Sequence, residues 1–292
     1  MRTSRRNARR RAFAVAAAAL VVLLLAGCGG GASRSNASPN YRTVALPSAA
    51  PDNAGAPGKR RPGYSDTNPP PVVDHGPRTG NAVALTFDAD MTTSMAARLH
   101  ANPNVSYANL AVITTLEQRR IPATFFITGM WAQEYPEVMA RLAANPDLEF
   151  GNHTWSHRAV TANCYGLPHM TPSELTDEVA RTFAAIRPYG GRQTNYFRFP
   201  GLCHDSAALA ALVPNHVTII DGDVVSGDPG ATAAEPIVSA VLRRVQPGSI
   251  VILHVTEDNA RFTDEALPAI LDGLAEKGLR PVRLSVLLGQ SD

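Results

Sequence analysis

Several features that would place this chain in a common protein class are missing from its sequence. No apolar run reaches the roughly 20 residues that a helix needs to span a bilayer, since residues 12–26 supply only about 15. The formal net charge is +2, but residues 1–27 hold six arginines and no acidic residue, so the remainder carries 21 − 25 = −4. A slightly acidic chain lacks the electrostatic footprint of a nucleic-acid-binding protein, and we expect no nucleic-acid partner.

Large apolar side chains are scarce in residues 29–80, which are rich in Gly, Ser, Pro, Asn and Ala. Such a segment cannot bury enough surface to offset the entropy lost on ordering, so we expect a disordered tether. Residues 81–292 remain as one domain, long enough to form a sizeable core. We expect this domain to be monomeric.

The N-terminus is organised like an export signal. Arginines between residues 2 and 11 precede the apolar run, which ends in small residues. The closing Leu25-Ala26-Gly27-Cys28 resembles the lipobox of bacterial lipoproteins, in which the cysteine receives lipid. The resemblance implies a signal peptide over residues 1–28 and a protein anchored through Cys28 to the outer face of the cell membrane. Ordinary cleavage and an uncleaved anchor are the alternatives, and Sec and twin-arginine export both stay open.

Cysteine is also scarce, with three in the whole chain. If Cys28 carries lipid, Cys164 and Cys203 remain in an oxidising compartment, where pairing is the default. We therefore expect a disulfide between them. Two separate thiols, or a metal site that uses Cys203 and His204, are the alternatives.

Short apolar runs alternate with amphipathic stretches from residue 82 onward. The expected strands are residues 82–87, 123–128, 148–150, 196–199, 217–220, 249–253 and 280–284. The expected helices are residues 108–119, 136–144, 172–186, 206–212, 235–245 and 264–277. This alternation predicts an α/β fold with a parallel sheet, either an incomplete barrel or an open doubly wound sheet. In both architectures the active site lies at the carboxyl ends of the strands.

Polar residues gather directly after these expected strands. They are Asp88, Asp90, His153, His157, Arg198, Asp221, Asp223, Asp228 and His254. A His-x₃-His pair together with a carboxylate supplies two nitrogens and an oxygen, which suits a hydrolytic metal site with open positions. The donor set fits Zn²⁺ first, with Co²⁺, Ni²⁺ or Mn²⁺ as alternatives.

These motifs, in this order, resemble those of the polysaccharide deacetylases, the NodB-homology carbohydrate esterases of family 4. The matching segments are Thr86-Phe87-Asp88-Ala89-Asp90, His153-Thr154-Trp155-Ser156-His157, Arg198-Phe199-Pro200 and Leu253-His254, with support from residues 121–126 and 248–254. The resemblance covers roughly residues 81–289. It implies a distorted (β/α) barrel of about seven strands and metal-dependent removal of N-acetyl, sometimes O-acetyl, groups from glycans.

The resemblance also implies a role for each matching residue. Asp90, His153 and His157 would hold the metal. Asp88 would be the general base, oriented and kept ionised by Arg198. His254 would be the general acid, oriented by Asp228. The substrate-binding set implied in this way is Pro200, Gly201, Ile252 and Trp155, although Trp155 has packing behind the metal as an alternative.

This chain departs from the family pattern at the first motif. The family has adjacent aspartates, whereas Ala89 separates Asp88 from Asp90. Because neighbouring strand residues point to opposite faces, we expect a bulge or the end of the strand here. An exchange of roles between Asp88 and Asp90 is the alternative. Pro229 and Gly201 replace a tryptophan and a tyrosine that are common in the family, and His204 is an additional candidate for the groove.

The expected function is therefore removal of N-acetyl groups from a cell-surface polysaccharide. Peptidoglycan amino sugars are the preferred substrate, because a protein anchored outside the membrane meets peptidoglycan first. An esterase acting on O-acetyl groups and an inactive glycan-binding protein of the same fold are the alternatives.

Overall fold

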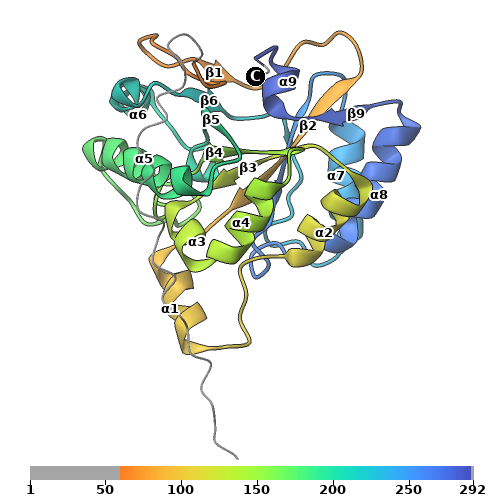
Figure 1. Ribbon diagram of the computed structural model, residues 1–292, viewed down its shortest axis with the longest axis horizontal. Coiled ribbons are helices and arrows are strands. Elements are labelled where there is room, and N and C mark those ends of the chain that lie inside the picture. The colour runs from red at the N-terminus through yellow and green to blue at the C-terminus, as the bar shows by residue number, and fades with distance from the viewer. Residues whose placement is uncertain (1–59, 291–292) are drawn as a thin grey trace, which may run out of the picture. The chain divides into compact units, whose positions relative to one another are not determined.

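The computed structural model describes residues 60–290, and a curled parallel β-sheet occupies their centre (Figure 1). Its strands are β1 (Val72–Val73), β2 (Ala82–Ala89), β3 (Ala123–Ile127), β4 (Leu148–Asn152), β5 (Arg192–Phe197), β6 (Thr218–Ile220), β7 (Val224–Val225), β8 (Ile250–His254) and β9 (Arg280–Val282). The predicted signal peptide, the lipidation at Cys28 and residues 29–59 of the predicted tether lie outside the described residues.

The sheet order is β1-β6-β5-β4-β3-β2-β8-β7, and all of these neighbours pair in parallel. Strand β9 pairs with Ala82–Ala84 of β2, while β3 pairs with Thr86–Ala89. Strand β8 pairs with Ala84–Asp88 along the other edge of β2. Strands β9 and β3 therefore pair with successive parts of the same edge of β2. The α/β prediction is confirmed. The sheet is an open, distorted barrel, because β1 and β7 are its two terminal strands and do not pair with each other.

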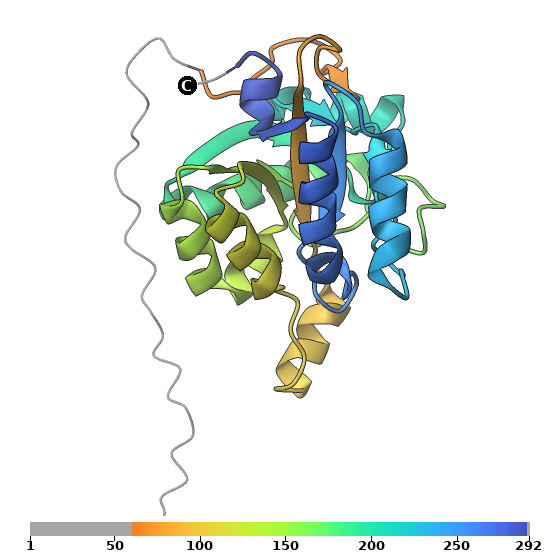
Figure 2. The ribbon, with the colours of Figure 1, turned by 90° about the vertical axis from the view of Figure 1, so that its right-hand side faces the viewer.

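Helices cover the outer face of this sheet, as Figures 1 and 2 show, apart from α9, which packs against its inner face. The helices are α1 (Thr93–Ala101), α2 (Leu110–Arg119), α3 (Gly129–Glu134), α4 (Pro136–Ala144), α5 (Pro172–Ile186), α6 (Ser206–Ala211), α7 (Ala234–Arg244), α8 (Thr263–Glu276) and α9 (Leu284–Leu287). Helices α7 and α8 lie side by side along β2 and β8 (Figure 2). None of the helices between residues 60 and 290 has the length and apolar character needed to cross a membrane.

Strand alternation separates an outer core from an inner face. Val83, Leu85, Phe87 and Ala89 of β2 pack into the outer core under the helices. Ala84 points to the opposite side and joins an inner apolar cluster with residues of β3, β5, β6, β8 and α9. Because side chains alternate with period two, the same inner face continues along β2 through residues 86 and 88. The inner face is therefore apolar at the amino ends of the strands and polar at their carboxyl ends.

Two helix ends carry capping motifs that are recognisable in the sequence. At the start of α5, the Thr171 side chain accepts the Glu174 N–H and the Glu174 side chain accepts the Thr171 N–H, which completes a capping box. At the end of α8, Gly278 has φ +69°, and the N–H groups of Gly278 and Leu279 donate to the carbonyls of Ala275 and Leu274. This Schellman arrangement satisfies carbonyls that the helix leaves free.

The boundary predicted at residue 80 is wrong for the part of the tether that the structure describes. Strand β1 pairs with β6, and His75 forms a bridge with Ser249 just before β8. The Gly76 N–H donates to the Gly248 carbonyl at 2.8 Å, and the Arg78 guanidinium lies 2.7 Å from Asp223. This segment crosses the open side of the barrel between β6 and β8. Its order comes from backbone partners far along the chain, which composition does not reveal.

Five of the strands and α-helices were not expected from the sequence. They are β1, β7, α1, α3 and α9, which have between two and nine residues. The two-residue strands β1 and β7 carry too few positions for a period to be recognised. The seven expected strands and six expected helices are all present, with boundaries that differ by up to four residues.

Candidate active site and metal centre

The two aspartates of the first motif reach the same side of the sheet. Strand β2 keeps its register with β3 and β8 up to Ala89, without a bulge, and Asp90 follows it directly. Ala89 packs into the outer core, so Asp88 and Asp90 both face inward. The Asp90 N–H donates to the Thr256 hydroxyl at 2.8 Å, which fixes the chain beyond the strand. Of the two expected explanations, the end of the strand is the correct one.

Asp90, His153 and His157 form a buried cluster that could hold a metal. Asp90 Oδ1 lies 3.5 Å from His153 Nε2 and 3.3 Å from His157 Nε2. The His153 Nδ1–H donates to the Arg198 carbonyl at 2.9 Å, and since a carbonyl can only accept, the neutral imidazole carries its lone pair on Nε2. Asp90 Oδ1 is buried and has no hydrogen-bond partner among the described residues. Converging lone pairs without a donor between them fit a bound cation.

The protonation states in the cluster suit metal binding. Burial lowers the pKa of His157 to about 4, so its imidazole is neutral at neutral pH. Burial raises the pKa of Asp90, but the neighbouring imidazoles of His157, His254 and His153 outweigh it and hold that pKa well below its ordinary value. A neutral imidazole and an ionised carboxylate are the forms that bind a divalent cation.

The loop that carries the second histidine has an unusual backbone. Thr154 and His157 both have left-handed φ values, +66° and +53°, which non-glycine residues rarely adopt. Glu178 of α5 holds this loop in place. Its carboxylate accepts the N–H groups of Trp155 and Ser156 at 3.1 Å and the Ser156 hydroxyl at 2.6 Å. Glu178 is therefore a positioning residue for His157.

Replacing Glu178 tests this role. We expect Glu178→Ala to weaken metal binding by about tenfold to a hundredfold, the range for partners that orient metal ligands, because two buried N–H groups lose their acceptor. Metal affinity, measured by competition with a chromogenic chelator, checks it. The matched control is Asp177→Ala, which removes an exposed carboxylate from the same turn of α5. Equal metal affinity of the two variants would contradict the role.

Arg198 engages the other aspartate. It follows β5, is fully buried, and its Nη1 donates to Asp88 Oδ1 at 2.6 Å and to the Thr86 hydroxyl at 2.9 Å. Its Nε donates to the Ile220 carbonyl at 3.1 Å, and the guanidinium lies over the Phe126 ring. Asp88 Oδ2 remains 3.8 Å from His153 Nε2. Asp88 is thus held by Arg198 at the edge of the cluster, which favours Asp90 as the third ligand over an exchange of roles.

His254, at the end of β8, approaches the cluster from the opposite side. Its Nδ1–H donates to Asp228 Oδ1 at 2.9 Å, and its Nε2 lies 3.9 Å from Asp90 Oδ2. Burial lowers the pKa of His254, but the charge and hydrogen bond of Asp228, together with Asp90 and Asp88, raise it to about 10. His254 therefore carries a proton at neutral pH and presents it toward the cluster.

Asp228 is itself fixed by several donors. The Ser226 hydroxyl donates to Oδ1 at 2.6 Å, and the Thr263 hydroxyl and the His254 N–H each donate to Oδ2 at 2.7 Å. Burial raises the pKa of Asp228, but His254 and the donating hydroxyls outweigh it and lower that pKa. Thr263, the first residue of α8, thus helps to orient this carboxylate.

The expected substrate-binding residues differ in their surroundings. Ile252 lies in register with Thr86, two residues before His254, and is 3% exposed. Pro200 is buried in a single 3₁₀ turn, Pro200–Leu202. The Trp155 ring lies beneath the Arg181 guanidinium at 3.5 Å and close against Gly129, which favours packing over sugar stacking. The substrate roles of Ile252, Pro200 and Gly201 stay predictions.

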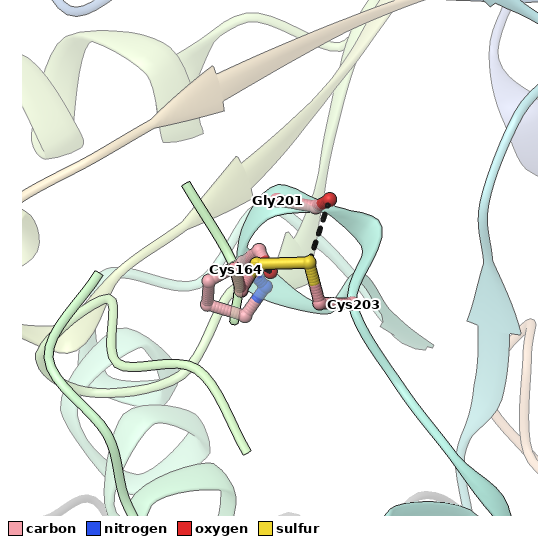
Figure 3. The surroundings of a disulfide bond; sticks show 4 residues. Cys164, Gly201 and Cys203 are labelled. Atoms are coloured by element: carbon pink, nitrogen blue, oxygen red, sulfur yellow. Dashed lines mark hydrogen bonds between the residues drawn. A yellow bond between two sulfur atoms is a disulfide. The ribbon is translucent and has the colours of Figure 1, made fainter. Parts of the chain in front are cut away.

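The Cys164–Cys203 disulfide is confirmed, with Cα atoms 6.0 Å apart, and it removes Cys203 as a metal ligand (Figure 3). His204 instead donates to Asp221 Oδ2 at 2.9 Å and packs against Phe199. Asp223 was expected near the site, and this is wrong. Its carboxylate accepts the Ile250 N–H at the amino end of β8, at the opposite end of the strand from His254.

Sequence reasoning missed Glu178, Thr86, Thr256 and Ser226 as supporting residues of the site. Glu178 left one usable signal. It lies within the buried stripe of α5, between Leu175 and Val179, where an apolar residue is the norm. A carboxylate in such a stripe has a buried partner elsewhere in the fold. The three hydroxyl residues left no comparable signal.

The chain is similar in sequence and in fold to known proteins of one family. A family model described as polysaccharide deacetylase matches residues 75–219. The chain is 30% identical over 168 residues to a chitooligosaccharide deacetylase of Bradyrhizobium sp. (strain ANU 289), covering 57% of this chain and 73% of the relative.

Solved structures share the fold. The Bc1960 peptidoglycan N-acetylglucosamine deacetylase superposes with a TM-score of 0.62 at 25% identity, covering 75% of this chain and 94% of that chain. BA3943 from Bacillus anthracis, a CE4 family pseudoenzyme, superposes with a TM-score of 0.61 at 20% identity, covering 76% and 70%. The chain described here belongs to the polysaccharide deacetylase family.

Proposed function

We propose that this protein is a metal-dependent hydrolase that removes N-acetyl groups from a cell-surface glycan. The observation that carries the proposal is the convergence of one carboxylate and two imidazoles, from Asp90, His153 and His157, between the carboxylate of Asp88 and the protonated imidazole of His254. Amide hydrolysis needs this combination. A base activates water on one side of the carbonyl carbon, and an acid protonates the leaving nitrogen.

The chain's own residues divide the proton transfers. Arg198 holds Asp88 Oδ1, which leaves Oδ2 on the side of the cluster to accept a proton from the attacking water. His254 Nε2, oriented by Asp228, donates a proton to the amide nitrogen as the carbon–nitrogen bond breaks. The products are acetate and a protonated amine, and one water molecule supplies the added oxygen of acetate and the two hydrogens that the nitrogen gains.

Asp90, His153 and His157 would hold a divalent cation, which when bound would supply Lewis-acid polarisation and lower the pKa of water at the site. Zn²⁺ is the preferred ion for this donor set, with Co²⁺, Ni²⁺ and Mn²⁺ as alternatives. The protein contributes the fixed geometry through the His153 hydrogen bond to Arg198 and the anchoring of the His157 loop by Glu178.

We further propose that the protein is exported and anchored through Cys28 to the outer face of the membrane, with peptidoglycan amino sugars as substrate. The Cys164–Cys203 disulfide supports export, because such bonds persist in oxidising compartments. An O-acetyl esterase would use the same acid, base and ligands. An inactive glycan-binding protein of the same fold has less support, because the acid, base and ligand side chains are all present and mutually positioned.

Acetate release from a panel of glycans tests the proposal. We expect release from N-acetylated peptidoglycan fragments and chito-oligosaccharides, loss of release on dialysis against a chelator, and recovery on addition of Zn²⁺. Hydrolysis of an N-acetyl group is recognised by its products, since a free amine appears in an amount equal to the acetate. Release only from O-acetylated xylan would favour the esterase. Binding of these glycans without release, with metal present, would favour the inactive alternative.

A further inference from the structure

One aromatic side chain near the site is exposed. Tyr165 is 88% exposed, whereas the other tyrosines between residues 60 and 290 are buried or half-buried. Single exposed apolar residues are common on protein surfaces and need no explanation by themselves. Tyr165 differs from such residues in how firmly its backbone is held and in what lies beside its ring.

The loop that carries Tyr165 is closed at its base and held near its tip. Ala159 donates to the Pro168 carbonyl at 2.9 Å and accepts the Met170 N–H at 2.8 Å, which closes the base. The neighbouring Cys164 is bonded to Cys203, which ties the loop to the segment after β5 (Figure 3). Tyr165 itself has φ +49°, a left-handed conformation that costs energy for a tyrosine. Strained backbone of this kind concentrates at functional sites.

The position of the ring links it to the proposed reaction. A side-chain carbon at Gly201 would lie 2.6 Å from Cys164 Sγ and 3.0 Å from Tyr165 Cδ2, so the ring edge and the disulfide both rest against this glycine. Gly201 follows Arg198 by three residues, at most about 10 Å of chain. Arg198 holds Asp88 and accepts the hydrogen bond of His153. Tyr165 therefore borders the segment that carries part of the site.

We propose that Tyr165 is a stacking platform for a pyranose ring of the glycan substrate, next to the sugar that carries the acetyl group. The inference rests on the proposed function, since it names a contact of the same site. A rigid aromatic ring offers a large apolar face at low entropic cost, and its hydroxyl can bond to sugar hydroxyls. The disulfide fixes the platform before the glycan binds, which avoids ordering the loop on binding.

Binding and turnover of tetra-N-acetylchitotetraose test the platform. In an Asp88→Asn background, which holds the glycan without turnover, calorimetry measures the affinity. We expect Tyr165→Ala to weaken binding about tenfold, Tyr165→Phe to stay within about threefold of the parent, and Cys164→Ser/Cys203→Ser to fall between them. With Asp88 restored, the ratio of kcat/KM for the tetramer to that for N-acetylglucosamine falls about tenfold in Tyr165→Ala.

The control is Val286→Ala, which trims an exposed apolar side chain on α9, beside the amino ends of the strands. We expect it to bind and turn over the tetramer like the parent, and thermal melting verifies folding of every variant. Parent-like tetramer affinity in Tyr165→Ala, or no tetramer binding by the parent, overturns the platform. If the protein binds the tetramer through Tyr165 but releases no acetate, the platform is upheld and the proposed function is rejected.

Discussion

Replacing Asp88 by asparagine is expected to lower kcat for acetate release by about a thousandfold, within the range for loss of a general base. Asparagine keeps the shape of the side chain but cannot accept the proton. Bound metal is expected to remain, because Asp90, His153 and His157 are unchanged. Steady-state acetate release and the metal content of the purified variant are the two measurements. Loss of the metal together with activity would mean that Asp88 is a ligand.

Asp88→Asn also deprives the buried Arg198 of its negative partner, which destabilises a protein whatever its function. A second variant separates this effect from catalysis. Asp223→Asn removes the negative partner of Arg78 at the amino end of β8, away from the site. We expect Asp223→Asn to keep acetate release near the parent value per folded molecule. Thermal unfolding of both variants shows whether their stabilities are comparable.

Replacing Asp90 by asparagine is expected to weaken metal binding by at least about a hundredfold, the upper end of what outer-shell changes cause. The reason is that Asp90 Oδ1 is the one charged donor between the two imidazoles. Competition with a chromogenic chelator gives the affinity. A second readout is stability, since an ion that binds only the folded chain raises the free energy of unfolding by about 4 kcal/mol at a thousandfold excess over Kd.

The thermal shift on adding Zn²⁺ should therefore be large in the parent and nearly absent in Asp90→Asn. Asp88→Asn is the matched control, since it changes the other carboxylate of the same strand end and should keep the shift. The reverse pattern, with the shift lost in Asp88→Asn and kept in Asp90→Asn, would establish the exchange of roles. The pair of variants thus decides between the two assignments without any substrate.

Much of the fold could be predicted because it is encoded locally. Each strand and helix of five or more residues shows its own hydrophobic period, apart from α1 and α3. The capping box at Thr171 and Glu174 uses neighbouring residues, so the sequence reveals it. His153 and His157 are likewise four residues apart, and their meeting depends on one short loop. The order of the motifs then sufficed to identify the family.

Other features depend on contacts between distant parts of the chain. Residues 60–80 have the composition of a tether, yet partners from β6 and the start of β8 order that segment. Tyr165 acquires its place from a disulfide across 39 residues. Glu178 interrupts the apolar stripe of α5, but the sequence does not show that its partner is the loop of His157. Composition and periodicity describe a residue's neighbours in sequence, so they do not predict these long-range contacts.

The metal ligands illustrate both cases. The sequence by itself determined that two histidines and a carboxylate meet at the carboxyl ends of the strands, because strand alternation and chain order require it. Only the tertiary structure gives the two aspartates different surroundings, which favour Asp90 as the ligand. That choice depends on Arg198, 110 residues further along the chain, which holds Asp88 and leaves Asp90 Oδ1 facing the imidazoles. A buried charged group pairs with the partner that the fold places beside it, and that placement depends on contacts between distant segments of the chain.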